Sequence, residues 1–224
     1  MAFCMLALAL AGCVQESVNR GHVALKIGDY ERAVLNFNQV LDQQPDHRDA
    51  RYGLALAYYG AAEQAEHMRA PSHDLWKKAA REFEILSKVD LTGRIDANYS
   101  TTLFYLARST LSINPRANVL SLLDRSIELD SLNYFSLNLK ALILSEQGFV
   151  EDAKKIFVYI VTKEPKFASA YLNLGNLYWN MGDVESAWDV WSMGSVKLPE
   201  NRALAHWTQI AEDSLKARVL SGEL

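Results

Sequence analysis

The residues that could carry chemistry in this sequence are few and lie far apart. Of 224 residues only two are cysteines, Cys4 and Cys13, and both fall within the first thirteen positions. The five histidines form no HExxH pair, and no local grouping with aspartate or glutamate resembles a set of metal ligands. Glycine-rich phosphate loops and a GxSxG nucleophile turn do not occur either. We therefore expect no enzyme activity, metal, cofactor or small-molecule substrate.

Cys13 has the most informative context, because it ends an apolar run. Residues 2–10 are apolar and uncharged, which suits the core of a signal peptide and is too short to cross a bilayer as a helix. The run leads into Leu10-Ala11-Gly12-Cys13, which resembles the lipobox of bacterial lipoproteins. The resemblance implies a signal peptide over residues 1–13 and lipid attachment at Cys13.

A lipid on Cys13 would place the protein in the bacterial cell envelope. Each buried CH₂ contributes about 0.8 kcal/mol, so several acyl chains hold a protein firmly at a membrane. Val14 stands where an aspartate would indicate inner-membrane retention, which favours the periplasmic face of the outer membrane. The first basic residue is Arg20, so the usual positive charge ahead of the apolar core is missing. The alternative is an apolar N-terminal helix with a coincidental LAGC in a soluble cytoplasmic or periplasmic protein.

The charged residues exclude one large class of partner. The formal net charge is −4, and acidic and basic residues alternate without forming blocks. A nucleic-acid-binding surface needs a basic stripe that can displace counterions, and the sequence has none. We expect no nucleic-acid partner.

Three segments of the chain are self-similar: GDYERAVLNFNQVLDQQP (28–45), GFVEDAKKIFVYIVTKEP (148–165) and GDVESAWDVWSMGSVKLP (182–199). Each begins with glycine, has alanine five residues later and an aromatic residue nine later, and ends in proline. The last two copies begin 34 residues apart. Apolar residues recur at helical spacing on both sides of each glycine, so we expect a helix, a turn and a second helix in each unit.

This 34-residue unit resembles the tetratricopeptide repeat (TPR), and the resemblance covers nearly everything after Cys13. It implies an all-α fold, a right-handed α-α superhelix of about five helix-turn-helix repeats with a C-terminal capping helix. Glycine would end the first helix, small residues would let the two helices approach, and proline would stop the second. The expected repeats are residues 14–47, 48–93 with an insertion, 100–133, 134–167 and 168–201, followed by a capping helix and tail over 202–224.

The second expected repeat contains about twelve extra residues around AAEQAEHMRAPSHD. These could lengthen the first helix until Pro71 breaks it, or they could form an element that protrudes toward a partner. Loops tolerate added length well, which favours the first interpretation.

The TPR resemblance also implies a binding surface, because the first helices of such repeats line a concave groove. The residues at the corresponding positions are mainly aromatic residues, asparagine, histidine and arginine, which suit a protein interface and an extended peptide backbone. They form the predicted groove: His22, Tyr52, Tyr59, Phe104, Tyr105, Arg108, Asn138, Asn173, Asn176, Trp179, Asn180 and His206.

Some TPR proteins grip a C-terminal carboxylate with a cluster of basic residues, and that cluster is absent here. Only Arg108 lies at a matching position, so we expect a neutral or mixed peptide, or a partner helix, in the groove. The resulting hypothesis is a non-catalytic protein-binding scaffold anchored to a membrane. It resembles, in outline, lipoproteins that assist pilus or secretin assembly and those that act as adaptors for peptidoglycan hydrolases. A soluble adaptor or regulatory subunit without lipid is the alternative.

Overall fold

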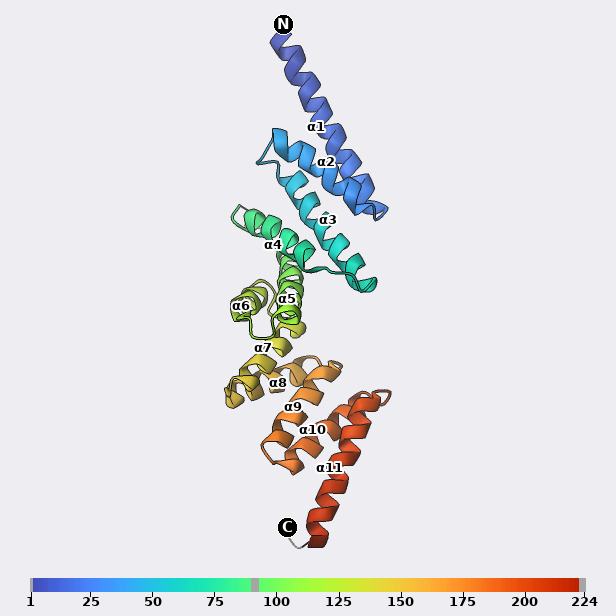
Figure 1. Cartoon of the computed structure of the whole chain (residues 1–224), viewed down its shortest axis with the longest axis vertical. Coiled ribbons are helices and arrows are strands. Elements are labelled where there is room, and N and C mark those ends of the chain that lie inside the picture. The colour runs from blue at the N-terminus through green and yellow to red at the C-terminus, as the bar shows by residue number, and fades with distance from the viewer. Residues whose placement is uncertain (1, 90–92, 222–224) are drawn as a thin grey trace. The chain divides into compact units, whose positions relative to one another are not determined.

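The structure is a computed structural model. The part of the chain that it describes consists of helices joined by turns. That part comprises residues 2–89 and 93–221, with side chains described from residue 12 onward, and it contains eleven helices and no strand (Figure 1). The predicted all-α class and the predicted helix-turn-helix packing are confirmed, since within each of two compact units every helix packs against the next one along the chain. The chain divides into two compact units, Met1–Asp130 and Ser131–Leu224.

The first unit has two buried clusters along its helices. One is centred on Phe37 and Val40, and the other on Phe83 and Leu103. The helices are α1 (Ala2–Lys26), α2 (Tyr30–Gln43), α3 (Arg48–His67), α4 (His73–Ser87), α5 (Asp96–Ile113) and α6 (Leu120–Leu129).

The second unit is built in the same way and has its own buried clusters, centred on Phe157 and on Trp191. Its last helix turns Leu204 and Ala211 inward, as expected for a cap that covers the end of an array. The helices are α7 (Tyr134–Glu146), α8 (Val150–Lys163), α9 (Ala168–Asn180), α10 (Val184–Lys197) and α11 (Arg202–Ser221).

Glycine ends the first helix of three pairs, as the repeat spacing predicts. Gly28, Gly148 and Gly182 have φ angles of 75°, 87° and 80°, a left-handed region that costs glycine least. The α5–α6 pair has Asn114 at this position with φ of −135°, so its helix ends in an extended residue instead. The third expected repeat therefore uses a different turn.

Small residues allow close contact between paired helices. Ala33, Ala153 and Ala187 are fully buried. A Cβ atom added to Gly175 would lie 2.2 Å from Nε1 of Trp191, so the indole fills the space that the glycine leaves.

The insertion lengthens a helix. Helix α3 has 20 residues, whereas α7 and α9 have 13 each. A short connection follows it, in which Arg69 has a φ angle of 55°. Lengthening of the first helix, the favoured interpretation of the insertion, is what the structure contains.

Helix α5 begins earlier than the expected repeat at residue 100. The buried residues Ile95, Tyr99 and Leu103 recur every four positions and continue the apolar stripe toward the N-terminus, which explains the early start. A helix of 18 residues results, beginning at Asp96.

Cys13 lies within helix α1 and is exposed, while Val14 and Val18 pack into the first cluster. Most of the predicted signal segment is helical, but its side chains before Gly12 and residue 1 itself lie outside the described part. Across that described part, none of the helices combines the length and the hydropathy that crossing a bilayer requires.

Candidate functional site

The predicted groove residues lie on alternate helices of each unit. Those of the first unit come from α1, α3 and α5, and those of the second unit from α7, α9 and α11. Nine of the twelve are half-buried, and only Arg108, Asn180 and His206 are exposed.

In the first unit, an aromatic cluster forms around a buried tryptophan. Trp76 of α4 has no exposed area. Tyr105 of α5 stacks on it with the ring centroids 4.6 Å apart and the planes 7° from parallel, and Tyr59 of α3 meets it edge-on at 5.3 Å. Three helices thus hold two half-buried tyrosines in place, since rings stacked on a buried partner have little freedom to turn.

Arg108 extends this cluster by one layer. Its guanidinium carbon lies 4.6 Å from the centroid of Tyr105 and 5.9 Å from that of Phe104, which is within the range of cation–π attraction. The same guanidinium donates to Oε2 of Glu66 at 2.6 Å. Arg108 is therefore held on two sides while remaining exposed.

Glu66, near the end of α3, links the aromatic cluster to the short segment between α3 and α4. Its Oε1 accepts hydrogen bonds from the Ser72 hydroxyl at 2.7 Å and from Nε1 of Trp76 at 3.2 Å. Partial burial works against ionisation of Glu66. The hydrogen bonds from Ser72 and Trp76, together with the Arg108 charge, outweigh it and lower the pKa of the carboxyl below its ordinary value.

Tyr59 stays neutral at ordinary pH. Burial raises the pKa of its hydroxyl, and the nearby Glu63 carboxylate raises it further. A protonated phenol can both donate and accept a hydrogen bond, which suits contact with a polypeptide.

His22 and Tyr52, the remaining predicted residues of this unit, lie in other contacts between helices. Nε2 of His22 is 3.1 Å from Oδ2 of Asp49, a contact between α1 and α3. Tyr52 meets Phe83 edge-on, and its hydroxyl accepts a hydrogen bond from Asn98 at 3.4 Å. The structure brings Tyr59, Phe104, Tyr105 and Arg108 together.

In the second unit, two predicted asparagines contact each other. Nδ2 of Asn173 on α9 donates to Oδ1 of Asn138 on α7 at 2.9 Å. Each amide keeps a free donor or acceptor, because an asparagine side chain has two donors and two acceptor positions. Asn176 is half-buried on α9, and Asn180 is the exposed last residue of that helix.

Aromatic residues continue toward the end of the second unit. Trp179 lies 5.9 Å from the buried Trp191, measured between ring centroids, and Trp191 lies 5.3 Å from Trp207 of α11. The exposed His206 meets Trp207 at 5.9 Å. Trp179 is half-buried, so one part of its surface is packed and another is open.

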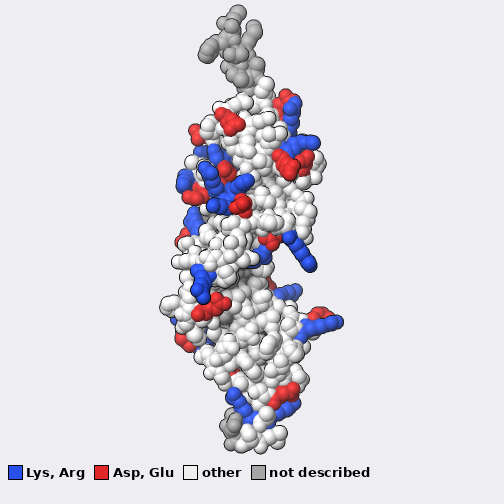
Figure 2. Space-filling model, viewed as in Figure 1, with Lys and Arg blue, Asp and Glu red and all other residues white. Residues whose placement is uncertain are grey.

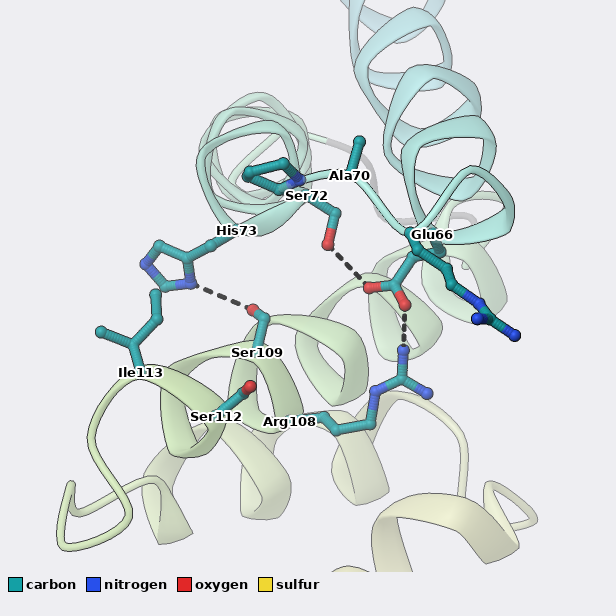
Figure 3. A pocket seen from close by; sticks show the side chains of 10 residues that line it. Glu66, Ala70, Ser72, His73, Arg108, Ser109, Ser112 and Ile113 are labelled. Carbon is teal, nitrogen blue, oxygen red and sulfur yellow. Dashed lines mark hydrogen bonds and ion pairs between the residues drawn. The ribbon is translucent and has the colours of Figure 1, made fainter.

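A polar pocket of about 520 Å³ lies beside the aromatic cluster of the first unit (Figure 3). We call it the turn pocket, because the α3–α4 connection forms one wall and α5 the other. Figure 3 shows the Ser72–Glu66–Arg108 chain of contacts on one side and the contact of His73 with Ser109 on the other, where Nδ1 and Oγ are 3.0 Å apart. The lining residues are Glu66, Arg69, Ala70, Pro71, Ser72, His73, Arg108, Ser109, Ser112 and Ile113.

Sequence reasoning missed Glu66, Arg69 and Ser72. The insertion that contains them was recognisable, but a contact between Glu66 and Arg108, 42 residues apart, depends on how the lengthened α3 packs against α5. No local spacing signals such a pair.

These side chains are suited to non-covalent recognition. Aromatic faces, amides and one guanidinium can bind a polypeptide without breaking bonds. No group of three histidine, cysteine, aspartate or glutamate residues that could hold a metal occurs among the residues described. Acidic and basic side chains are mixed on the face shown in Figure 2.

Comparisons with known sequences match two segments of the chain. Models of the tetratricopeptide repeat match residues 18–66 and 168–187. The first spans α1 to α3, and the second spans α9 and the start of α10. No curated protein matches the chain.

Several solved structures have a similar fold. YrrB, described as a TPR protein with an unusual peptide-binding site, aligns at a TM-score of 0.60 and 18% identity over 86% of this chain and 90% of its own. MamA from Desulfovibrio magneticus RS-1 aligns at 0.56 and 14%, over 75% and 89%. The C-terminal part of a TPR protein from Cytophaga hutchinsonii aligns at 0.62 and 12%, over 89% and 72%. At these identities the likeness concerns the fold alone.

Proposed function

We propose that this chain, a tetratricopeptide repeat protein by its fold, is a non-catalytic scaffold that binds a polypeptide on the first helices of its repeats. The observation that carries the proposal is the aromatic cluster on α3, α4 and α5. Tyr59 and Tyr105 pack against the buried Trp76 and keep part of their rings accessible, and Arg108 lies over Tyr105. Tyrosine, tryptophan and arginine are the residues that contribute most at protein interfaces.

The fixed positions of these rings favour binding. Immobilising a flexible side chain at an interface costs roughly 0.5–1.5 kcal/mol. Tyr105 is already stacked, and Arg108 is already held by Glu66. A partner that contacts them has less ordering to impose, so more of the contact energy appears as affinity.

The asparagines of the second unit would serve an extended peptide. The hydrogen bond between Asn138 and Asn173 orients both amides and leaves Nδ2 and Oδ1 groups for a partner's backbone. Peptide binding is what the description of YrrB states for that protein. We extend it to this chain as part of the proposal.

The experiment is capture of partners from envelope and soluble extracts with the Tyr105→Ala, Trp179→Ala double variant. We expect the double variant to lose the proteins that the wild type retains, because each substitution removes an accessible ring. Tyr159→Ala is the matched control, since Tyr159 is an exposed tyrosine on α8, outside the predicted groove. Equal capture by the double variant and the wild type, with both folded by circular dichroism, would refute the binding surface.

Lipid attachment at Cys13 is the second part of the proposal. It is supported by the Leu10-Ala11-Gly12-Cys13 motif and by the position of the thiol, which is exposed one residue before the buried Val14. A lipid there would tether the array directly and leave its core intact. Such a scaffold would hold its partner at an envelope membrane, in the manner of lipoproteins for pilus or secretin assembly or for peptidoglycan hydrolases.

Labelling of cells with radioactive palmitate tests the anchor. We expect label in the wild type and none in Cys13→Ser. Equal labelling of both proteins, or release of the wild type from membranes by carbonate, would instead favour the soluble adaptor.

A further inference from the structure

An apolar cleft of about 490 Å³ lies beside the C-terminal half of α11 in the second unit. We call it the end cleft. One of its lining residues comes from α10 and the others come from α11, so the cleft lies within one unit. The lining residues are Trp188, Glu212, Leu215, Lys216, Val219 and Leu220.

The apolar stripe of α11 continues past the part of the helix that is buried. Leu204 and Ala211 are fully buried, and Leu215 packs against the buried cluster formed by α9, α10 and α11. Val219, four residues further along the same face, is 62% exposed, and the neighbouring Leu220 is 88% exposed. Figure 1 shows α11 running on beyond α9 and α10 at this end. An exposed apolar patch beside a cleft is typical of an interaction surface.

One wall of the end cleft contains an unsatisfied hydrogen-bond donor. Nε1 of Trp188 is buried and has no partner among the residues that the structure describes. By contrast, Nε1 of Trp76 and Nε1 of Trp191 donate to acceptors at 3.2 and 3.3 Å. Buried donors without a partner are rare in folded proteins, because leaving them unsatisfied costs free energy. The single chain therefore leaves this wall incomplete.

The charged residues beside the cleft favour one kind of occupant. Glu212 and Lys216 form an ion pair at 2.6 Å, so together they bring no net charge to the cleft. Along the helix, the acidic Glu212 and Asp213 precede the basic Lys216 and Arg218. A parallel copy of this helix would bring like charges together. In an antiparallel copy that crosses near Leu215, the acidic turn of each helix lies beside the basic turn of the other, so the charges are complementary.

We propose that two copies of this chain pair through their end clefts, with the two α11 helices antiparallel. The pairing buries Val219 and Leu220 of each copy against the other, and it sets the acidic and basic turns of α11 opposite each other. Because both copies use the same face, the assembly closes at two.

The pairing goes beyond the proposed binding of a polypeptide. None of the predicted groove residues lines the end cleft, so either proposal can fail without the other. A pair of chains would present two sets of groove residues. A partner with two binding segments would then be retained more firmly than by one chain alone.

Sedimentation equilibrium of the full chain tests the pairing. Cys4→Ser and Cys13→Ser are present in every protein, so that neither lipid nor a disulfide joins the copies. Small interfaces are weak, so the measurements should extend from about 1 to about 300 µM. We expect the apparent mass to rise from 25.2 kDa toward twice that value. A mass that stays at one chain throughout this range would overturn the proposal.

The indole N–H signals of the ¹⁵N-labelled protein locate the contact. We expect the NMR signal of Trp188 to move with protein concentration along the same curve as the mass. The signal of Trp76, which belongs to the first unit, should stay in place. Association without movement of the Trp188 signal would mean that the copies meet elsewhere, and it would overturn the proposal as well.

Leu220→Glu should weaken the association by at least about tenfold, because it places a charge in an apolar contact. Val196→Glu is the matched control, since Val196 is 77% exposed on α10 and does not line the end cleft. The control should stay within about twofold of wild type. Equal association of these two variants would contradict pairing through the end cleft.

Charge reversal tests the choice of a second antiparallel copy. One protein carries Lys216→Glu with Arg218→Glu, and another carries Glu212→Lys with Asp213→Lys. Each protein alone should remain a single chain, because like charges then face each other, and an equimolar mixture should associate at least as tightly as wild type. Restored association in the mixture also shows that both proteins are folded. A mixture that stays dissociated, with both proteins helical by circular dichroism, would reject the antiparallel pair.

Discussion

At Glu66, three neighbouring donors compete with partial burial over the ionisation of one carboxyl group. Burial disfavours the charged form, whereas Ser72, Trp76 and Arg108 favour it, and the pKa falls below the ordinary value of 4.5. A single side chain thereby joins α3, the start of α4 and α5. Its charge state affects both the stability of the first unit and the field in the turn pocket.

Replacing Glu66 with glutamine should destabilise the protein in a pH-dependent way. The folded pKa lies below the unfolded one, so ionised Glu66 stabilises the fold above about pH 4.5, and this contribution is lost as the pH falls through the folded pKa. At pH 7 we expect Glu66→Gln to lower the free energy of unfolding by about 1 kcal/mol. Urea denaturation at pH 7 and at pH 3 measures the difference.

The difference between Glu66→Gln and wild type should shrink at pH 3. Glu128→Gln is a suitable control, because Glu128 forms an exposed pair with Arg125 that contributes little. A difference that is unchanged or larger at pH 3 would contradict the assigned direction of the pKa shift.

At the scale of the helices, turns and close contacts decide where each pair begins and ends. The residue pattern predicted the helix pairs well, because the glycine that ends a helix and the alanine that lets two helices approach both belong to the same repeat. Gly28, Gly148 and Gly182 adopt the positive φ angle that the repeat spacing indicates, and Ala153 and Ala187 are fully buried. These requirements can be recognised within one repeat.

Contacts between repeats were much less predictable. The Glu66–Arg108 pair and the turn pocket exist because α3 is longer than α7 or α9 and its end reaches α5. The turn after α5 likewise departs from the pattern, since Asn114 is extended and not left-handed. Such features depend on packing between segments far apart in the sequence, which periodicity alone does not contain.

Gly182→Ala isolates the backbone cost of a turn. A Cβ atom there would meet nothing within 4 Å, so the substitution adds strain at φ of 80° without a clash. We expect a loss of about 1 kcal/mol in the free energy of unfolding, measured by urea denaturation. Gly182→Asn should lose less, because asparagine tolerates the left-handed region better. Equal stability of all three proteins would show that the turn can relax.

At the scale of the whole molecule, stability is distributed among separate buried clusters. The first unit has clusters around Phe37 and Phe83, and the second around Phe157 and Trp191. In arrays of this kind each repeat is stabilised mainly by its neighbours in the chain, so a local change should have a local effect.

Ala187→Leu tests this local character. Ala187 is fully buried in the cluster that contains Tyr171, Trp191 and Leu204, so three extra carbons must displace neighbours. Overfilling of a packed core costs about 1–3 kcal/mol. We expect faster amide hydrogen exchange in α9, α10 and α11 and unchanged exchange in α2 and α3.

Ala205→Leu, an exposed position on α11, is the control for side-chain size. A wild-type melting temperature for Ala187→Leu would mean that the paired helices α9 and α10 do not need a small residue there, contrary to the repeat assignment. Acceleration of exchange through every helix of both units would mean that the chain unfolds as one cooperative body. Faster exchange confined to α9–α11 would instead locate the stabilising contacts of that segment within the second unit.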